Sequence, residues 1–447
     1  MRATEEFVGP STELLQSLIR NECVNDGTPD SGHETRNADL LETFLEGAGL
    51  DVARFEKQPG RASIVARIEG SEPDAPSLCM MGHTDVVPVN LDGWSRDPFA
   101  GELIDGEVWG RGAIDMLNVT ASMAVAFRRL AADGFRPRGD LIYFGVADEE
   151  AGGEWGAKFM VDEHWDAVGA DYVVTELGGW SSVDAHGTRH ITINVGEKGI
   201  AWTRVRVKGT PAHGSMPYGA DNALITAAEI VRRLSEFRPP TRIDETWKRQ
   251  VQILDIPDDL RNALTDPARI WEAFAALPPA AARIAHACTH TTFSPNVAHG
   301  GQKTNTIPDV VDLDVDIRLA PGDDQASARE YLQEALGELA DRVEMSSLQQ
   351  ADPTASATGN ALWDAIARRA QVAYPGAELE PGLITGGTDA RFFREKGSIA
   401  YGAGLYAPGV TLESFGQRFH GNDERIDTES LGLSGEFWYG LAHEVVG

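Results

Sequence analysis

The chain has 447 residues, of which 42% are hydrophobic and 24% are charged, and its formal net charge is −30 at pH 7. The length predicts more than one domain, and the apolar fraction is typical of folded globular proteins and excludes a disordered chain. The acidic excess excludes nucleic acid and anionic membranes as partners, because both would repel it, and its spread along the chain indicates a solvated acidic surface.

The first part of the chain alternates helical and strand patterns. Helical spacing of apolar residues, the first time after a Ser/Thr start, predicts helices over residues 11–22, 37–50 and 116–134. Short β-rich runs predict strands in "SIVARIEG" (63–70), "SLCMMGHTDVVPV" (77–89), "DLIYFGVADEE" (140–150) and "DYVVTE" (171–176). Strands that are apolar throughout, with helices between them, predict an α/β fold with a mainly parallel mixed sheet and helices on both faces.

From residue 191 the pattern changes. The stretch "ITINVGEKGIAWTRVRVKG" (191–209) alternates with period two, which is typical of antiparallel strands with one solvated face. Further helical and alternating patterns follow, and the Pro-, Trp- and Ala-rich segment 239–298 is interpreted as an insertion. We therefore expect a small α+β domain over residues 192–348, inserted into a larger α/β domain that comprises residues 1–191 and 349–447.

The compartment is predicted from the cysteines and from the start of the chain. Cys23, Cys79 and Cys288 are odd in number and match no metal-binding spacing, so free thiols are expected. The start "MRATEEFVGP" lacks the basic and apolar regions of a secretory signal, and no segment approaches the ~18 uninterrupted apolar residues of a membrane span. These features predict a cytoplasmic protein.

Two polar side chains interrupt the apolar run "MMGHTDVVPV" (80–89). His83 and Asp85 are two residues apart, so in a strand both would project from the same face. A metal-binding imidazole usually donates its second N–H to a carboxylate, so His83 as ligand and Asp85 as its orienting partner fit this spacing. A hydrogen-bonded core histidine beside a strand-end aspartate is the alternative.

Carboxylates follow other predicted elements in comparable places. Asp115, in "VWGRGAIDMLN", follows a glycine turn and precedes a helix, so it either bridges two metal ions or caps the helix. Asp148, Glu149 and Glu150 directly follow an apolar strand, and burying three carboxylates there requires cations, whereas an exposed acidic loop does not. Adjacent glutamates point in different directions, so one is able to bind metal while the other acts as general base towards a water.

Glu176 ends the strand "DYVVTELGG", and His420 lies in the turn-like stretch "FGQRFHGNDERID". Together with the residues above they form a set of imidazoles and carboxylates, mostly at strand ends, where open α/β sheets bind ligands. This set predicts a site for two metal ions. Imidazole and carboxylate ligands without thiolate favour zinc, with manganese or cobalt as alternatives.

Several stretches resemble, in order, the motifs of one enzyme family: "GHTDVVP", "GRGAIDM", "DEEAGG", "GTPAHGSMP", "GGTDARFF" and "FHGNDE". The family comprises binuclear zinc metallopeptidases and amidohydrolases such as carboxypeptidase G, succinyl-diaminopimelate desuccinylase, acetylornithine deacetylase and aminoacylase. The resemblance spans nearly the whole chain. It implies a zinc-exopeptidase catalytic domain with an inserted ferredoxin-like lid and dimerisation domain.

The resemblance also implies a role for each candidate residue of the metal site. Asp115 would bridge both ions, His83 and Glu176 would complete one site, and Glu150 and His420 would complete the other. Glu149 would be the general base and Asp85 the orienting partner of His83. Members with a glutamate at the position of Glu176 tend to be deacylases or carboxypeptidases.

The lid domain would contribute to catalysis and to substrate binding. The stretch "GTPAHGSMP" resembles the lid histidine motif, which implies that His213 polarises the scissile carbonyl in the active site of a neighbouring subunit. A turn histidine at a dimer interface is the alternative. Asn305 and Arg318 match substrate-holding positions, although Arg318 also suits a structural ion pair. The substrate carboxylate would contact Gly386, Gly387 and Thr388 of "GGTDARFF".

The resemblance thus implies a metal-dependent hydrolase that cleaves an amide or peptide bond next to a free carboxylate. An N-acyl-amino-acid deacylase or a carboxypeptidase-type exopeptidase is expected, acting on acylated amino acids or short peptides as a homodimer. A dipeptidase and an N-carbamoyl-amino-acid hydrolase are alternatives. A catalytically silent binding protein on the same fold is a further alternative, against which Glu149 and the complete ligand set argue.

Overall fold

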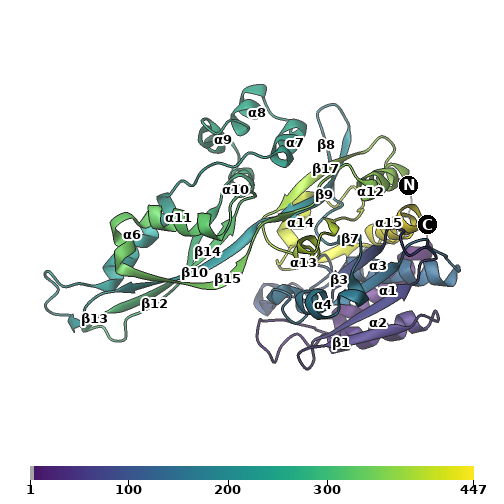
Figure 1. The fold of residues 1–447 in the computed structure, drawn as a ribbon, viewed down its shortest axis with the longest axis horizontal. Helices are drawn as coiled ribbons and strands as arrows, with labels where there is room; N and C mark the ends of the chain where they lie inside the picture. The colour runs from purple at the N-terminus through teal and green to yellow at the C-terminus, as the bar shows by residue number, and fades with distance from the viewer. Residues whose placement is uncertain (1–4) are drawn as a thin grey trace. The chain divides into compact units, whose positions relative to one another are not determined.

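The computed structural model describes residues 5–447. By their internal contacts the residues divide into two compact units. The first comprises Met1–Val195, Ala355–Gly382 and Thr388–Gly447, and the second comprises Gly196–Thr354 and Leu383–Gly387. The first unit is an α/β structure and the second combines antiparallel strands with helices (Figure 1).

A mixed ten-stranded sheet forms the centre of the first unit. Its main path runs β1-β2-β6-β3-β7-β18-β9-β16, and β8 and β17 pair with β9. The four neighbours β6, β3, β7 and β18 are parallel. Strand β2 pairs antiparallel with β1 and β6, and β9 pairs antiparallel with β18 and β8. The strands are β1 (Val52–Glu56), β2 (Ala62–Ile68), β3 (Leu78–His83), β6 (Leu141–Val146), β7 (Tyr172–Thr175), β8 (Ser181–Val183), β9 (Arg189–Glu197), β16 (Thr354–Ala355), β17 (Glu378–Ile384) and β18 (Ile399–Gly402).

Helices cover both faces of this sheet because its central strands are apolar on both sides. Met80 and Tyr143 belong to one hydrophobic cluster, and their neighbours Met81 and Phe144 belong to another, as expected for side chains that alternate between faces. The first cluster includes residues of α1 (Glu5–Arg20), α2 (Thr35–Glu46), α3 (Leu117–Ala132), α12 (Ala361–Ala373) and α15 (Thr428–Val446). The second includes residues of α4 (Ala157–Glu163), α5 (Trp165–Val168) and α13 (Ala390–Glu395).

A small three-stranded sheet joins residues from opposite ends of the first unit's sequence. Its order is β19-β5-β4, and β19 (Arg425–Asp427) pairs antiparallel with β5 (Glu107–Trp109), which pairs with β4 (Glu102–Ile104). The short helix α14 (Leu412–Arg418) precedes β19, and the 3-10 helices η1 (Leu91–Gly93) and η2 (Glu149–Ala151) lie in loops. This pairing brings the residues before β19 next to the loop that follows β5.

The second unit contains a four-stranded antiparallel sheet of order β12-β14-β10-β15. Along β14, buried and partly exposed residues alternate, because one face packs on helices while the other carries cross-strand ion pairs such as Arg204–Asp314 and Arg206–Asp312. The elements are β10 (Gly199–Lys208), β12 (Thr292–Gly300), β14 (Val310–Leu319), β15 (Val343–Ala351), α6 (Ala223–Glu236), α11 (Gln325–Leu336), η3 (Gly337–Arg342) and the ribbon β11 (Ala212–His213) with β13 (Thr306–Ile307).

The segment 239–298 contributes four short helices and the start of β12. Trp247, Val251 and Leu264 form a small hydrophobic core of their own within these helices. The helices are α7 (Glu245–Ile253), α8 (Asp258–Leu264), α9 (Ile270–Ala276) and α10 (Pro279–Thr289). Within residues 5–447, no helix is long and apolar enough to cross a membrane.

Two expectations about elements are wrong. Helix α1 begins at Glu5 and not at the Ser/Thr start near residue 11, and it contains Pro10. Phe7 lies seven residues before Leu14 and is buried on the same face, so core packing extends the helix through the proline. Strand β9 has no solvated face, because it lies inside the large sheet and most of its residues are buried.

Candidate metal centre

Three neighbouring parallel strands end at the same edge of the large sheet, and each carries a candidate residue there. His83 is the last residue of β3 and stands in register with Val146, the last residue of β6. Glu149 follows shortly after β6, and Glu176 directly follows β7. The carboxyl ends of parallel strands meet at one edge of a sheet, so the topology brings these side chains together.

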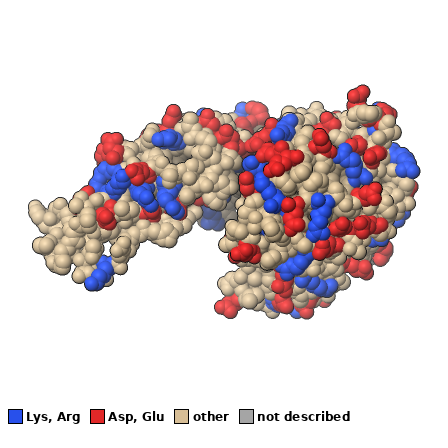
Figure 2. Space-filling view, turned by 60° about the horizontal axis from the view of Figure 1, so that its bottom comes forward, with Lys and Arg blue, Asp and Glu red and all other residues tan. Residues whose placement is uncertain are grey.

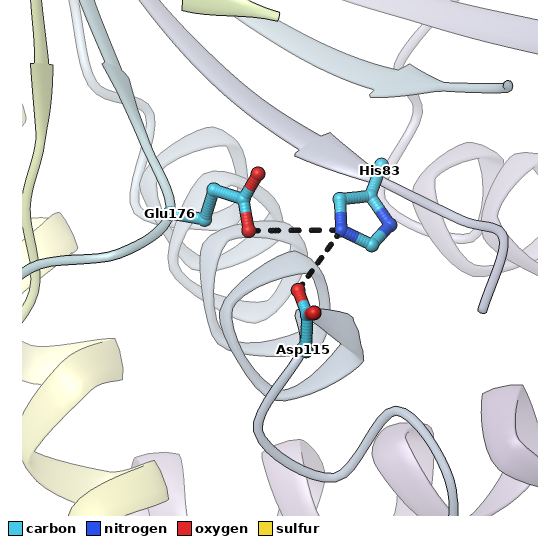
Figure 3. Close-up of side chains that lie close together, drawn as sticks. All are labelled: His83, Asp115 and Glu176. Atoms are coloured by element: carbon cyan, nitrogen blue, oxygen red, sulfur yellow. Dashed lines mark hydrogen bonds and ion pairs between the residues drawn. The ribbon is translucent and has the colours of Figure 1, made fainter. Parts of the chain in front are cut away.

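The first group of potential metal ligands is His83, Asp115 and Glu176 (Figure 3). The imidazole of His83 faces both carboxylates, with its Nε2 atom 3.3 Å from Asp115 Oδ1 and 3.7 Å from Glu176 Oε2. All three residues are buried. Asp115 does not cap α3, since the N-cap residue is Met116 and no side-chain cap bond is present there.

The second group is Asp115, Glu150 and His420. His420 Nε2 lies 2.8 Å from Asp115 Oδ2 and 3.3 Å from Glu150 Oε2. The Glu150 side chain is only 6% exposed, so it does not lie in the exposed acidic loop that was the alternative interpretation. The His420 side chain is 43% exposed. Asp115 therefore offers one carboxylate oxygen to each group, which is the arrangement of a bridging ligand.

The distances between potential ligand atoms fit a metal ion. Metal–ligand bonds of about 2.0–2.2 Å in a tetrahedron separate neighbouring ligand atoms by roughly 3.4 Å. The separations of 3.3 and 3.7 Å at His83 and of 3.3 Å between His420 and Glu150 are close to that value. The 2.8 Å separation of His420 and Asp115 is a hydrogen-bond distance, and it would widen by roughly half an ångström around an ion.

The carboxylates of the site repel one another, which is the second indication that the groups suit cations. Burial raises the pKa of Glu149 well above its usual range, and the charge of Glu176 adds to this effect. Burial together with the charge of Asp115 raises the pKa of Glu150 to about 6 and that of Glu176 to about 8. Within the described chain, Oε1 of Glu150 is buried without a hydrogen-bond partner. Cations among these groups would remove the repulsion and use the unpaired oxygen.

The imidazoles respond to the same charges. Burial favours a neutral His420, but its hydrogen bonds to Asp115 and Glu150 outweigh burial and raise its pKa to about 10. The pKa of His83 is likewise raised well above its usual range by Asp115 and Glu176, against the effect of burial. The pKa of Asp115 is lowered, because contacts with His420 and His83 outweigh its burial. A metal ion would bind the same nitrogen lone pairs that protons occupy in its absence, so metal binding would release protons from the two histidines.

A buried ion pair holds the two loops that carry Asp115 and His420. Glu424 Oε1 accepts hydrogen bonds from the backbone N–H groups of Ile114, at 2.7 Å, and Asp115, at 3.2 Å. Its Oε2 accepts a bond from Arg111 Nη1 at 2.8 Å, and Arg111 Nη2 donates to the His420 carbonyl at 3.4 Å. Glu424 and Arg111 belong to motifs that the sequence singled out, but nothing in one sequence indicated that they contact each other.

Asp85 lies beside His83, as expected, but a different atom is nearest. His83 Nδ1 is 3.0 Å from the backbone carbonyl of Asp85 and 3.5 Å from its carboxylate. Asp148 also differs from the expectation that three successive carboxylates would need cations. It belongs to neither group of potential ligands, and its Oδ1 accepts a bond from the buried Arg61 Nη2 at 2.7 Å.

Asp389 is a buried carboxylate that the sequence analysis did not single out. Among the described residues, neither of its side-chain oxygens has a hydrogen-bond partner. A Cβ atom at Gly153 would lie 2.5 Å from Asp389 Oδ1, so the glycine after the Glu149–Glu150 turn allows this close approach. Burial raises the pKa of Asp389 to about 7, and its charge contributes to the raised pKa of Glu149. The adjacent Thr388 is buried.

The lid candidates lie in the second unit. His213 is exposed on strand β11, which pairs with β13 so that His213 stands opposite Thr306. Its Nδ1 atom lies 2.7 Å from Ser215 Oγ. The carbonyl of Asn305 accepts a bond from the Gly214 N–H at 2.8 Å. Asn305 is therefore a direct neighbour of the His213 turn.

Arg318, Gly386 and Gly387 also belong to the second unit. Arg318 Nε donates to Asp316 Oδ1 at 2.8 Å, and its guanidinium lies over the Trp202 ring, 5.2 Å from the centroid. This is the structural ion pair that the sequence left open as an alternative. The Arg318 side chain is 23% exposed.

Comparison with known proteins identifies the family. The profile of "Peptidase family M20/M25/M40" matches residues 79–444. The chain belongs to this family. Members are metallohydrolases that act on amide or peptide bonds, and both groups of potential ligands described above lie within the matched range.

Individual relatives and solved structures agree with this assignment. Aminoacylase-1 from Sus scrofa is 28% identical over 423 residues, which cover 93% of this chain and 90% of the relative. Succinyl-diaminopimelate desuccinylase from Rhodopseudomonas palustris is 34% identical over 230 residues, or 50% of this chain and 56% of the relative. An M20 family metallo-carboxypeptidase from Sulfolobus solfataricus has the same fold, with a TM-score of 0.74 at 19% identity over 97% of this chain and 99% of that one.

The comparisons confirm the fold that the sequence predicted. A mainly parallel mixed sheet with helices on both faces is joined to a second unit with a separate antiparallel sheet, as in the M20 fold. They also confirm the resemblance to aminoacylase and succinyl-diaminopimelate desuccinylase. An M20 peptidase from Bacillus subtilis whose structure is known is described as binding a dinuclear metal.

Proposed function

We propose that this hydrolase cleaves an amide or peptide bond next to a free carboxylate, as an N-acyl-amino-acid deacylase or a carboxypeptidase-type exopeptidase. The similarity to aminoacylase-1 over nearly the whole chain supports a deacylase, and the glutamate at position 176 agrees with both activities. The observation that carries the proposal is the Asp115 carboxylate, which presents one oxygen to each of two ligand groups.

The residues of the two groups would hold two divalent ions. His83 and Glu176 would complete one coordination sphere and Glu150 and His420 the other, with Asp115 shared. Nitrogen and carboxylate ligands without thiolate favour zinc, and manganese and cobalt are compatible with the same donors. When bound, such ions act as Lewis acids that acidify a water and polarise a carbonyl.

Glu149 would serve as the general base. It lies one residue before Glu150 in the turn that follows β6, partly buried among the other carboxylates. Its carboxylate would accept a proton from the attacking water and return that proton to the leaving amine nitrogen. Asp85 would orient His83 through the contacts that join them.

Residues of the second unit, together with Thr388 of the first, would bind and polarise the substrate. Asn305 and the N–H groups of Gly386 and Gly387 would hold the substrate carboxylate together with Thr388, and Arg318 would add a charge-assisted contact. His213 would donate a hydrogen bond to the carbonyl oxygen as negative charge develops there. Its exposure, with only Ser215 as a side-chain neighbour within hydrogen-bond distance among the described residues, leaves Nε2 available for that contact.

A homodimer through the lid domain is part of the proposal. Large apolar side chains are exposed on the second unit, with Met216 at 69%, Tyr218 at 102% and Ile225 at 69% of full exposure. Figure 2 shows few charged side chains at the end of the view where β13 lies in Figure 1. Exposed apolar side chains that gather in a patch are typical of an interface. A cytoplasmic location remains a prediction.

The general base is tested by Glu149→Gln, with Glu154→Gln as control, since Glu154 is exposed in the same loop. We expect Glu149→Gln to bind two metal ions with unchanged stoichiometry and to lose activity by several orders of magnitude, because the amide accepts no proton. Glu154→Gln should behave as wild type. Near-normal turnover of Glu149→Gln would refute its assignment.

The substrate class is tested by parallel assays on N-acetyl amino acids, peptides longer than two residues with a free C-terminal carboxylate, dipeptides and N-carbamoyl amino acids. The acylated amino acids or the longer peptides should give the highest kcat/KM, and amidation of their carboxylate should abolish turnover. Preference for dipeptides or for carbamoyl compounds would select one of the alternatives. Complete absence of turnover in the metal-loaded protein would overturn the proposal.

The contribution of His213 to a neighbouring subunit is tested by mixing two inactive variants. His213→Ala and Glu149→Gln should each be inactive as homodimers. A mixed dimer places an intact His213 beside an intact Glu149 in one of its two sites, so exchange of subunits should restore activity. If mixing restores nothing although mixed dimers form, His213 acts within its own subunit or not at all.

A further inference from the structure

A buried polar network lies next to the metal-binding groups and comes from the N-terminal part of the chain. It consists of Asn25 in the loop after α1, Glu34 directly before α2, and Arg61 directly before β2, all of them fully or almost fully buried. All three precede residue 79, where the match to the family profile begins. The motifs of the metal site therefore assign no role to them.

Asp85 connects this network to both groups of potential ligands. Its backbone carbonyl lies 3.0 Å from His83 Nδ1, which belongs to the first group. Its carboxylate Oδ2 accepts a bond from the backbone N–H of Glu150 at 3.1 Å, and Glu150 belongs to the second group. A displacement of Asp85 would thus move a ligand in each group.

Asn25 holds the Asp85 carboxylate. Its amide Nδ2 donates to Asp85 Oδ2 at 2.8 Å and lies 3.3 Å from Asp148 Oδ1. On the other side of the amide, Oδ1 accepts bonds from the Gly27 N–H at 3.0 Å and from Ser31 Oγ at 3.4 Å. Donors on that side fix the orientation of the amide, so its N–H groups face the two carboxylates.

Asp148 in turn fixes the turn that carries Glu149 and Glu150. Its backbone is left-handed, with φ of 71°, and Arg61 and the N–H of Trp155 bind its carboxylate at 2.7 and 2.8 Å. Aspartate enters this conformation more readily than most non-glycine residues, and these hydrogen bonds hold it there. Asn25 is therefore hydrogen-bonded to Asp85, which lies beside His83, and to Asp148, which begins the turn that carries the adjacent glutamates.

We propose that Asn25 is a positioning residue that sets the geometry of both metal-binding groups through Asp85 and Asp148. The side chain has to be a neutral donor of this length, because it stands between two carboxylates that would otherwise repel each other. An aspartate at position 25 would have nearly the same volume, but it would replace the two N–H donors by a carboxylate oxygen and so place a third carboxylate beside those of Asp85 and Asp148. The inference rests on the proposed metal centre.

The test compares Asn25→Asp and Asn25→Ala with wild type and with Asn360→Ala as control. Asn360 caps α12 and donates to the Tyr401 hydroxyl and the Ala357 carbonyl, so its removal also costs side-chain hydrogen bonds in the first unit. Metal-free protein is titrated with Co²⁺ alone, and binding is followed by calorimetry and by the visible absorption of the cobalt. Thermal midpoints of the metal-free proteins report the loss of stability separately.

We expect wild type and Asn360→Ala to bind two cobalt ions with the same affinity and spectrum. Both Asn25 variants should bind each ion about 10- to 100-fold more weakly, with an altered spectrum, and Asn25→Asp should be no better than Asn25→Ala. If Asn25→Asp does not fold, Asn25→Ala alone decides. Wild-type affinity in Asn25→Ala, or in a folded Asn25→Asp, would overturn the inference, whereas a wild type that binds no cobalt would overturn the metal centre itself.

Discussion

The ion pair between Glu424 and Arg111 gives a prediction whose size follows from the contacts. Both side chains are buried, and the carboxylate of Glu424 accepts two backbone N–H groups in addition to the guanidinium. In Glu424→Gln, an uncharged amide would face Arg111, and the buried guanidinium would lose its counter-charge. Breaking a buried pair by removing one partner costs about 3–5 kcal/mol.

A pair in the adjacent three-stranded sheet provides the matched control. Arg425 Nε donates to Glu107 Oε2 at 3.0 Å, but these side chains are 26% and 31% exposed. Because solvent screens such a pair, Glu107→Gln should cost about 0.2–1 kcal/mol. The two substitutions are chemically identical, so the difference between their costs measures burial together with the two backbone hydrogen bonds that Glu424 accepts.

Hydrogen exchange in urea, read by mass spectrometry on peptides that cover residues 105–118, measures the free energy of unfolding for this part of the first unit. Glu424→Gln should lower that free energy by about 3–5 kcal/mol, and adding Arg111→Met should recover part of the loss because both charges are then gone. A cost for Glu424→Gln no larger than that for Glu107→Gln would refute the reasoning. So would a Glu424→Gln, Arg111→Met double variant whose cost equals the sum of the costs of its two single variants.

Three other predictions concern salt, pH and metal. Raising the salt concentration from about 0.1 to about 1 M shortens the Debye length from about 10 to about 3 Å, so the thermal midpoint of a chain with a net charge of −30 should rise, and a lower midpoint would contradict this. Burial raises the pKa of Glu380 to about 8. The folded state therefore keeps this proton at pH values where the unfolded chain, with a pKa of about 4.3 for glutamate, has released it. The free energy of unfolding thus falls as the pH rises from about 4.3 to about 8. Glu380→Gln should therefore raise the midpoint at pH 8 and leave it unchanged at pH 4, and equal effects at both would refute the sign. Zinc at about 100 times its Kd should stabilise the metal-free protein by about 2.7 kcal/mol, and no shift would show that no ion binds the folded state.

The distribution of charge bears on the salt prediction. Figure 2 shows acidic side chains scattered over the visible face of the molecule and interspersed with basic ones. Ion pairs such as Arg233–Glu338 and Arg54–Asp39 match one acidic residue with one basic residue, so they leave the net charge of −30 unchanged. This net negative charge is self-repulsive, and only screening or bound cations reduce that repulsion.

Much of the catalytic fold was predictable because its signals are local. The apolar runs of β3 and β6 and the helical spacing of α3 predicted buried parallel strands with a helix between them. His83 and Glu176 stood out because they are polar residues at the ends of such strands. The parallel topology then requires that they meet at one edge of the sheet.

The parts that were not predictable depend on partners far away in the sequence. Strand β9 alternates in sequence like a strand with one solvated face, but its place inside the large sheet is a tertiary property. Glu424 and Arg111 pair across 313 residues, and Asn25 reaches Asp148 across 123. A single sequence contains no sign of either contact, because an isolated Asn, Arg or Glu reads as an ordinary surface residue.

The domain boundaries at 191/192 and 348/349 remain predictions about folding units. The contact-based division places residues 196–354 in the second unit and adds the short segment Leu383–Gly387. Limited proteolysis would show whether the chain is cleaved first near these positions. Resistance there, with cleavage inside 192–348 instead, would argue against a separately folded lid.

The central claim is that Asp115 bridges two metal ions held by His83, Glu176, Glu150 and His420. X-ray diffraction from crystals grown with zinc, with data collected on both sides of the zinc absorption edge, tests it most directly. We expect two anomalous peaks about 3.5–4 Å apart, each at bonding distance from a different oxygen of the Asp115 carboxylate. A single peak, or peaks that do not touch Asp115, would contradict the account.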